Sequence, residues 1–163
     1  MLILTRLNGM HPTLPLAELE ATFQATKIDY WLIKKIGNFC LHEVTRLSDE
    51  LGRRLALTHE IYKVLSTSSD YNLAQLLDFD ASEIEMPYKV EVKSIDGYKP
   101  VSTTMFADEV WKRLTSLGLK PRVDVHKPAC LLTLFTSKEG CFLTKKILEI
   151  DKKQFQVRNP ARR

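Results

Sequence analysis

Hydrophobic positions in the first eighty residues fall into short runs and helical spacings that define successive elements. Apolar runs of strand length predict four strands, at residues 1–7, 28–35, 38–44 and 60–66. After the first strand, Pro15 suits the first turn of a helix, and Leu16, Leu19 and Phe23 follow at helical spacing. The pattern therefore predicts a strand, a helix and two further strands before residue 45.

A second helix and the fourth strand complete this half of the chain. Ser48 precedes the apolar Leu51 and has the side chain of a helix N-cap, and Asp70 similarly precedes a short helix that contains Leu73. The order β-α-β-β-α-β, with one helix appended, predicts an α+β fold whose residues 1–80 form a ferredoxin-like domain.

The remaining residues predict a second domain, of mixed α/β type. Residues 78–87 are polar and acidic and end in a proline, as expected of a linker. A helix is expected at 103–117, ended by Gly118. Extended segments are expected at residues 88–95, 122–126, 130–137 and 141–150. We therefore expect a domain over 81–151 and a basic tail or connector over 152–163.

Composition is that of a globular protein of one large or two small domains. The chain has 163 residues, of which 44% are hydrophobic and 27% charged. No apolar run approaches the roughly 20 residues that cross a bilayer, so no membrane partner is expected. The three cysteines lack CxxC spacing, which disfavours a metal site and favours reduced thiols in a cytoplasmic protein.

Charge is distributed unevenly between the two halves. Residues 1–80 carry a net charge of −2, whereas residues 81–163 carry +6. Such asymmetry is typical of a phosphate-binding half beside a neutral scaffold half. A solvated lysine-rich surface without a ligand is the alternative that charge alone leaves open.

Cations without an expected carboxylate partner are the candidate RNA-binding residues. On the predicted helix, Asp108 lies four residues before Lys112 and Glu109 four before Arg113, so both cations are expected to be ion-paired. The six candidates lie in later segments: Lys120, Arg122, Lys127, Lys138, Lys145 and Lys146. Lys145 and Lys146 are neighbours in one strand, so only one of them can readily face a common ligand. Tyr98, in a turn, is a candidate stacking aromatic or a packed turn residue.

The end of the chain resembles a THUMP domain, the RNA-binding module attached to several tRNA-modifying enzymes. The resemblance rests on the run Val123-Asp-Val-His-Lys-Pro128, which leads to a hairpin ending in Glu149-Ile-Asp151. It implies tRNA as the partner, bound through its single-stranded 3′ end. One departure is Glu91, which interrupts the basic residues expected in the first strand of such a domain.

The N-terminal half resembles the start of archaeal tRNA guanosine-10 N2-methyltransferases. The similar phrase begins His11-Pro-Thr-Leu-Pro-Leu-Ala-Glu-Leu-Glu. In that family a ferredoxin-like domain precedes the THUMP domain, and a basic connector leads on to a catalytic domain. We expect His11 to be a loop residue, and Glu18 and Glu20 to be solvent-facing charges of the helix.

Sequence motifs for catalysis are missing from the chain. The six glycines lie at least fifteen residues apart, so no Gly-rich turn for S-adenosylmethionine is present, and Asn159-Pro160 is not followed by Pro and an aromatic. Cys40 and His42 share a strand face, and we expect them to be structural. Two functions remain. One is a tRNA-binding module of, or partner to, a tRNA (guanine-N2-)-methyltransferase whose cofactor lies elsewhere. The other is a protein-interaction or structural protein that has the THUMP fold and no RNA site.

Overall fold

The computed structural model describes residues 1–48 and 50–151, which form a mixed α/β fold with one seven-stranded sheet. The strand order is β2-β3-β1-β4-β7-β6-β5. The chain divides into two compact units: Met1–Lys63 with the described residues from Ile147 onward, and Val64–Lys146. β4 (Thr58–Ser68) and β7 (Gly140–Glu149) contribute residues to both units.

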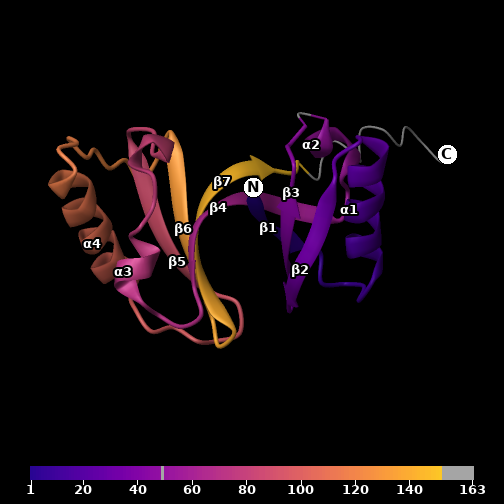
Figure 1. Ribbon diagram of the computed structural model, residues 1–163, viewed down its shortest axis with the longest axis horizontal. Coiled ribbons are helices and arrows are strands. Elements are labelled where there is room, and N and C mark those ends of the chain that lie inside the picture. Colours follow the sequence, from indigo (N-terminus) through magenta and orange to yellow (C-terminus); the bar gives the residue numbers. More distant parts are fainter. Residues whose placement is uncertain (49, 152–163) are drawn as a thin grey trace. The chain divides into compact units, whose positions relative to one another are not determined.

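The first unit is an antiparallel sheet covered on one face by helices (Figure 1). Its elements are β1 (Leu2–Leu7), α1 (Leu14–Ala25), β2 (Tyr30–Ile36), β3 (Phe39–Val44), α2 (Leu51–Arg54) and the first part of β4. Leu19 and Phe23 of α1 are buried against Ile3, Cys40 and Ile61 of the sheet. These are the apolar positions that helical and strand periodicity predicted.

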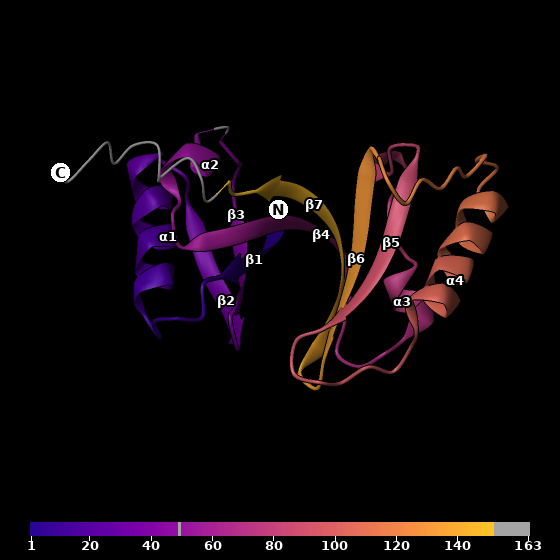
Figure 2. The same cartoon turned by 180° about the vertical axis from the view of Figure 1, so that it is seen from behind.

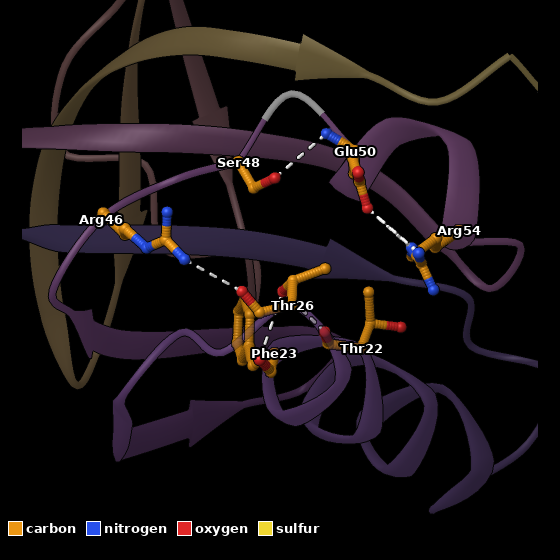
Figure 3. A network of polar contacts seen from close by, with 7 residues as sticks. All are labelled: Thr22, Phe23, Thr26, Arg46, Ser48, Glu50 and Arg54. Carbon is orange, nitrogen blue, oxygen red and sulfur yellow. Dashed lines mark hydrogen bonds and ion pairs between the residues drawn. The ribbon is translucent and has the colours of Figure 1, made fainter.

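Side chains hold the helix ends of the first unit (Figure 3). At the end of α1, Thr26 Oγ1 donates to the carbonyl of Thr22 at 2.8 Å, and Arg46 Nη2 donates to the carbonyl of Thr26 at 3.2 Å. The negative end of the helix dipole also stabilises a cation at this position. Before α2, Ser48 Oγ accepts the N–H of Glu50 at 3.2 Å. The N-cap residue of α2 is Glu50, so Ser48 lies two residues before the cap position that the sequence predicted for it.

Glu18 corrects the expectation that the carboxylates of α1 face solvent. Its Oε1 and Oε2 accept the backbone N–H groups of Ala56 and Leu57 at 2.9 and 2.8 Å. A carboxylate that satisfies two loop amides contributes to folding, because those donors otherwise lose their hydrogen bonds on burial. Glu18 therefore ties α1 to the loop before β4.

The second unit packs α4 (Thr103–Ser116) against one face of its strands (Figure 2). Its other elements are the second part of β4, α3 (Leu73–Leu76), a 3-10 turn (Ala81–Glu83), β5 (Tyr88–Ser94), β6 (Cys130–Ser137) and β7. β5 runs parallel to β6, and β6 antiparallel to β7. Phe106, Val110 and Leu114 of α4 are buried in this core, and Ser102 caps the helix by accepting the N–H of Met105.

Residues 78–87 are a compact part of the second unit, not the linker that their polarity predicted. Ile84 is buried in the core of that unit, and Asp80 caps the 3-10 turn by accepting the N–H of Ser82 at 2.9 Å. The boundary expected at residue 80 therefore lies inside the second unit. The polar composition predicted a linker, but two buried apolar side chains, Phe79 and Ile84, hold this otherwise acidic segment in the core.

Two smaller expectations also fail. Asn72 caps α3 by accepting the N–H of Gln75 at 3.2 Å, in place of Asp70. The segment 122–126 is not a strand, since Val123 alone forms an isolated bridge, to Tyr88. The basic tail expected over 152–163 lies outside the described residues. Within residues 1–48 and 50–151, helices are too short or too polar to cross a membrane.

Candidate nucleic-acid interface

The candidate interface is the connection between α4 and β6, residues 117–129, which we call the α4–β6 segment. It is fixed to the start of β5 by backbone hydrogen bonds. Tyr88 donates to the carbonyl of Arg122 at 2.9 Å, Asp124 donates to Tyr88 at 3.1 Å, and Ala129 donates to Pro87 at 2.7 Å. These bonds hold an irregular segment in one conformation, so its side chains project from a defined backbone.

Positive charge dominates the α4–β6 segment. Lys120, Arg122 and Lys127 are exposed, and Asp124 is the one carboxylate of the segment. Asp124 Oδ1 accepts the N–H groups of Lys127 and His126 at 3.0 and 2.8 Å. These backbone bonds, with a smaller effect of the Arg122 charge, hold the pKa of Asp124 below its usual value. Asp124 therefore stays ionised and shapes the loop, and the segment keeps a positive balance.

Apolar side chains are exposed among these cations. Val123 and Val125 are 49% and 58% exposed, and Leu119 is 38% exposed. Exposed aliphatic groups interleaved with cations can contact sugar and base faces while the cations contact phosphates. Sequence reasoning placed the cations here and missed the apolar side chains, although the alternation of valine with charged residues was a visible signal.

Lys138 does not join the α4–β6 segment. It is exposed in the β6–β7 turn, where its backbone N–H donates to Asp96 Oδ2 at 2.8 Å. That bond and one from Tyr98 lower the pKa of Asp96. The eight residues of β6 separate this turn from the α4–β6 segment, which is about 25 Å of extended chain. Tyr98 packs against the core of the second unit, as the alternative of a packed turn residue proposed.

Lys145 is engaged within the fold. Its Nζ lies 2.7 Å from Glu85 Oε1 and donates to the carbonyl of Glu83 at 2.9 Å. Burial disfavours the charged ammonium, but the hydrogen bond and charge of Glu85 prevail and raise the pKa of Lys145. Lys146, the next residue of β7, faces the opposite side of the strand.

The predicted ion pairs of α4 are half confirmed. Lys112 lies 2.7 Å from Asp108 and 2.9 Å from Glu109, and these carboxylates raise the pKa of the lysine. Arg113 does not use Glu109: its Nε donates to the carbonyl of Leu77 at 3.1 Å. Arg113 is therefore a structural residue that joins α4 to the end of α3.

β5 carries two lysines that share one carboxylate. Glu91 lies 2.9 Å from Lys89 and 2.8 Å from Lys93, all on the face opposite α4. The hydrogen bond from Lys93 is the main cause of the lowered pKa of Glu91. The departure noted at Glu91 thus has a physical effect, since the carboxylate partly neutralises both neighbouring cations.

Cys40 and His42 are core residues. Burial raises the pKa of the Cys40 thiol to about 11 and lowers the pKa of His42 to about 4. His42 lies against the rings of Phe23 and Tyr30, and its two nitrogens have no hydrogen-bond partner among the described residues. A protonated thiol and a neutral, enclosed imidazole do not make a nucleophile and base. Within residues 1–48 and 50–151, no group of side chains has the arrangement of a metal site.

In sequence, the chain resembles part of a tRNA-modifying enzyme. It is 28% identical over 167 residues to the tRNA (guanine(10)-N2)-dimethyltransferase of Methanothermobacter thermautotrophicus, across 96% of this chain and 47% of that protein. The chain thus spans about half the length of the curated relative it matches. No family model matches it.

In fold, the chain resembles parts of larger proteins. PH1313 from Pyrococcus horikoshii Ot3 superposes with a TM-score of 0.67 at 10% identity, over 91% of this chain and 55% of that one. TrmN from Thermus thermophilus gives 0.65 at 18% identity, over 92% and 46%. A 4-thiouridine synthetase, solved with RNA and ATP, gives 0.59 at 15% identity, over 91% and 42%. Together with the sequence match, these likenesses support a protein related to THUMP-containing tRNA methyltransferases.

Proposed function

We propose that the chain is a tRNA-binding module of, or partner to, a tRNA (guanine-N2-)-methyltransferase. The observation that carries the proposal is the α4–β6 segment, where Lys120, Arg122 and Lys127 are exposed beside a single carboxylate already bonded to backbone. The sequence likeness to a tRNA (guanine(10)-N2)-dimethyltransferase supports tRNA as the nucleic acid. Lys146 is the further candidate contact on β7.

The chemistry of the α4–β6 segment suits a flexible RNA end. Lysine binds phosphate as a point charge, and arginine can bind it in a bidentate fork, so the three cations follow a backbone without reading bases. The exposed Val123 and Val125 offer apolar contact to sugar and base faces that a single strand leaves open. We therefore propose the single-stranded 3′ end of tRNA as the ligand of this segment.

The architecture we propose is a ferredoxin-like domain built mainly from the first unit, followed by a THUMP domain built mainly from the second. The succession β-α-β-β-α-β and the strand order β2-β3-β1-β4 support the first assignment. The likeness to a synthetase solved with RNA supports the second. β4 and β7 then belong to the cores of both domains. The three free, buried cysteines support a cytoplasmic location.

Methyl transfer belongs, in this proposal, to a catalytic domain or subunit that the chain serves. S-adenosylmethionine needs glycines that let the backbone approach the cofactor, and the glycines here lie at least fifteen residues apart. The residues of this chain therefore do not fit the cofactor, and we derive no chemical step through it.

A protein-interaction function is the second candidate, and one observation favours it. Trp31, Leu32 and Ile33 on β2 are 60%, 42% and 52% exposed, and β2 is an edge strand of the sheet. An exposed apolar edge is a common place for another chain to add a strand. This candidate is compatible with the RNA proposal if the partner is the catalytic subunit.

The test is binding of the whole chain to a tRNA transcript and to the same transcript trimmed of its single-stranded 3′ end. We expect weak binding that falls steeply with salt, with the trimmed tRNA bound less tightly. Equal binding to both transcripts would remove the 3′ end from the proposal. Absence of binding to either, at low salt, would leave the protein-interaction function as the better one.

A further inference from the structure

The first unit has a polar pocket of about 350 Å³, and none of its lining residues belongs to the α4–β6 segment. It lies where the loop after β1 meets the β2–β3 turn, and its polar lining consists of Asn8, His11, Lys35 and Asn38. The other lining residues are glycine, proline and leucine, so this described lining contains a cation and no carboxylate.

Hydrogen bonds within the loop fix which atoms remain available to a ligand. Asn8 Oδ1 accepts the N–H of Met10 at 2.9 Å, which leaves its amide nitrogen as a donor. His11 Nδ1 accepts the N–H groups of Thr13 and Leu14 at 3.3 and 3.1 Å. A ring whose Nδ1 accepts carries its proton on Nε2, so the outer nitrogen of His11 is also a donor. The backbone N–H groups of Thr13 and Leu14, at the start of α1, already donate to His11. The donors that remain for a ligand are therefore side-chain groups.

Lys35 supplies the charge of the pocket. Its Nζ donates to the carbonyl of Pro12 at 2.9 Å, which holds the ammonium beside the loop and leaves two further protons. The backbone of Asn38, in the β2–β3 turn, is fixed because its main-chain carbonyl accepts the N–H of Leu7 at 2.8 Å. Gly9 packs so closely that a Cβ there would lie 2.4 Å from Asn38 Nδ2. The donors are therefore held in place before a ligand arrives.

We propose that this pocket binds a phosphate group of the RNA backbone. A phosphate oxygen accepts hydrogen bonds and donates none, and the pocket offers an ammonium, an imidazole N–H and an amide N–H without a competing carboxylate. The proposal rests on the proposed tRNA function for the source of the phosphate. It gives the first unit, expected to be scaffold, an RNA contact of its own.

Inorganic phosphate, titrated into the whole chain and followed by NMR, tests the pocket without RNA. Shifts are expected at His11, Lys35 and Asn38, with chloride at equal ionic strength as the reference. Lys35→Ala is expected to weaken phosphate binding roughly tenfold, the effect of one charge-assisted hydrogen bond. Lys34→Ala removes the neighbouring lysine, which does not line the pocket, and should leave phosphate binding unchanged.

Asn8→Asp is the sharper variant, because Asp keeps the oxygen that accepts Met10 N–H and replaces the donor by a negative oxygen. It should abolish the phosphate shifts while the chain stays folded. Asn72→Asp is the matched control, since Asn72 also uses Oδ1 to accept a backbone N–H, at α3 in the second unit. Phosphate shifts that persist in Lys35→Ala and Asn8→Asp would overturn the proposed pocket.

Binding of tRNA to the same variants separates this inference from the proposed function. If the pocket holds an RNA phosphate, Lys35→Ala should make the slope of log affinity against log salt shallower by about 0.7 to 0.9. Unchanged tRNA affinity and slope in Lys35→Ala and Asn8→Asp would overturn the pocket while leaving tRNA binding intact. Phosphate binding that depends on Lys35 in a chain that binds no tRNA would instead overturn the proposed function and keep the anion site.

Discussion

The ammonium of Lys145 lies 2.7 Å from the carboxylate of Glu85, sixty residues earlier in the chain. The same ammonium donates to the carbonyl of Glu83, so one lysine fixes the end of the acidic segment 78–87 to β7. The sequence predicted that Lys145 contacts RNA. Its partners instead make it a structural cation of the second unit.

Lys145→Ala should therefore act on stability and leave RNA binding nearly unchanged. We expect the free energy of unfolding to fall by on the order of 1 kcal/mol, because the Glu85 end of the pair is exposed to solvent. Urea denaturation measures the loss. A fall in tRNA affinity larger than the fall seen for Lys112→Ala would show that Lys145 contacts RNA after all.

Glu18→Ala should destabilise the first unit by about 1 to 2 kcal/mol, since two backbone N–H groups lose their acceptor. Those donors are the N–H groups of Ala56 and Leu57 before β4. Glu20→Ala removes a carboxylate from the same helix without touching that loop and serves as the control. Thermal unfolding followed by circular dichroism compares the two, and equal midpoints would contradict the role given to Glu18.

His42 should make stability depend on pH. Burial lowers its pKa to about 4 in the folded chain, from an unfolded value of 6.5. Between these values the unfolded chain binds a proton that the folded chain does not, so stability falls as pH falls. The expected loss between about pH 7 and pH 5 is roughly 2 kcal/mol. Urea denaturation at several pH values measures it.

His42→Leu keeps the apolar contact with Phe23 and Tyr30 and should abolish this pH dependence. His126→Asn replaces an exposed histidine of the α4–β6 segment and should retain it. A decline of equal size in His42→Leu would assign the pH dependence to other groups.

Periodicity predicted the elements because burial decides them. Leu19 and Phe23 on α1, and Phe106, Val110 and Leu114 on α4, are buried at the predicted helical spacing. α4, at Thr103–Ser116, matches the helix predicted over 103–117. The cap at Ser102 and the hairpin ending in β7 follow from the same local rules. Local chemistry of this kind is visible in the sequence.

Contacts between distant residues were not visible. Glu18 was expected to face solvent and Lys145 to contact RNA, and each is bonded to backbone groups brought near only by folding. Lys127 and Lys138 were both candidate RNA contacts, and β6 separates them, because Lys127 precedes the strand and Lys138 follows it. Residues 122–126 were expected to be an extended segment, whereas the backbone bonds of the α4–β6 segment run to Tyr88 and Pro87 at single positions.

Single charge deletions in the α4–β6 segment are the basis of the central test. Three variants, Lys120→Ala, Arg122→Ala and Lys127→Ala, each remove one exposed cation. Lys112→Ala removes a cation that is already ion-paired with Asp108 and Glu109. Arg113 is unsuitable as a control, because its side chain bonds the carbonyl of Leu77. Exposed cations contribute little to folding, so the unfolding midpoints of the four variants should stay close to that of the unmodified chain.

The dependence of tRNA affinity on salt measures directly whether the α4–β6 segment binds RNA. Each of the three segment variants should lower tRNA affinity and make the slope of log affinity against log salt shallower by about 0.7, as one phosphate contact on a single strand is lost. Lys112→Ala should leave both the affinity and the slope unchanged. A slope that changes in Lys112→Ala, and stays constant in the three segment variants, would contradict the assignment of this segment as the RNA-binding surface.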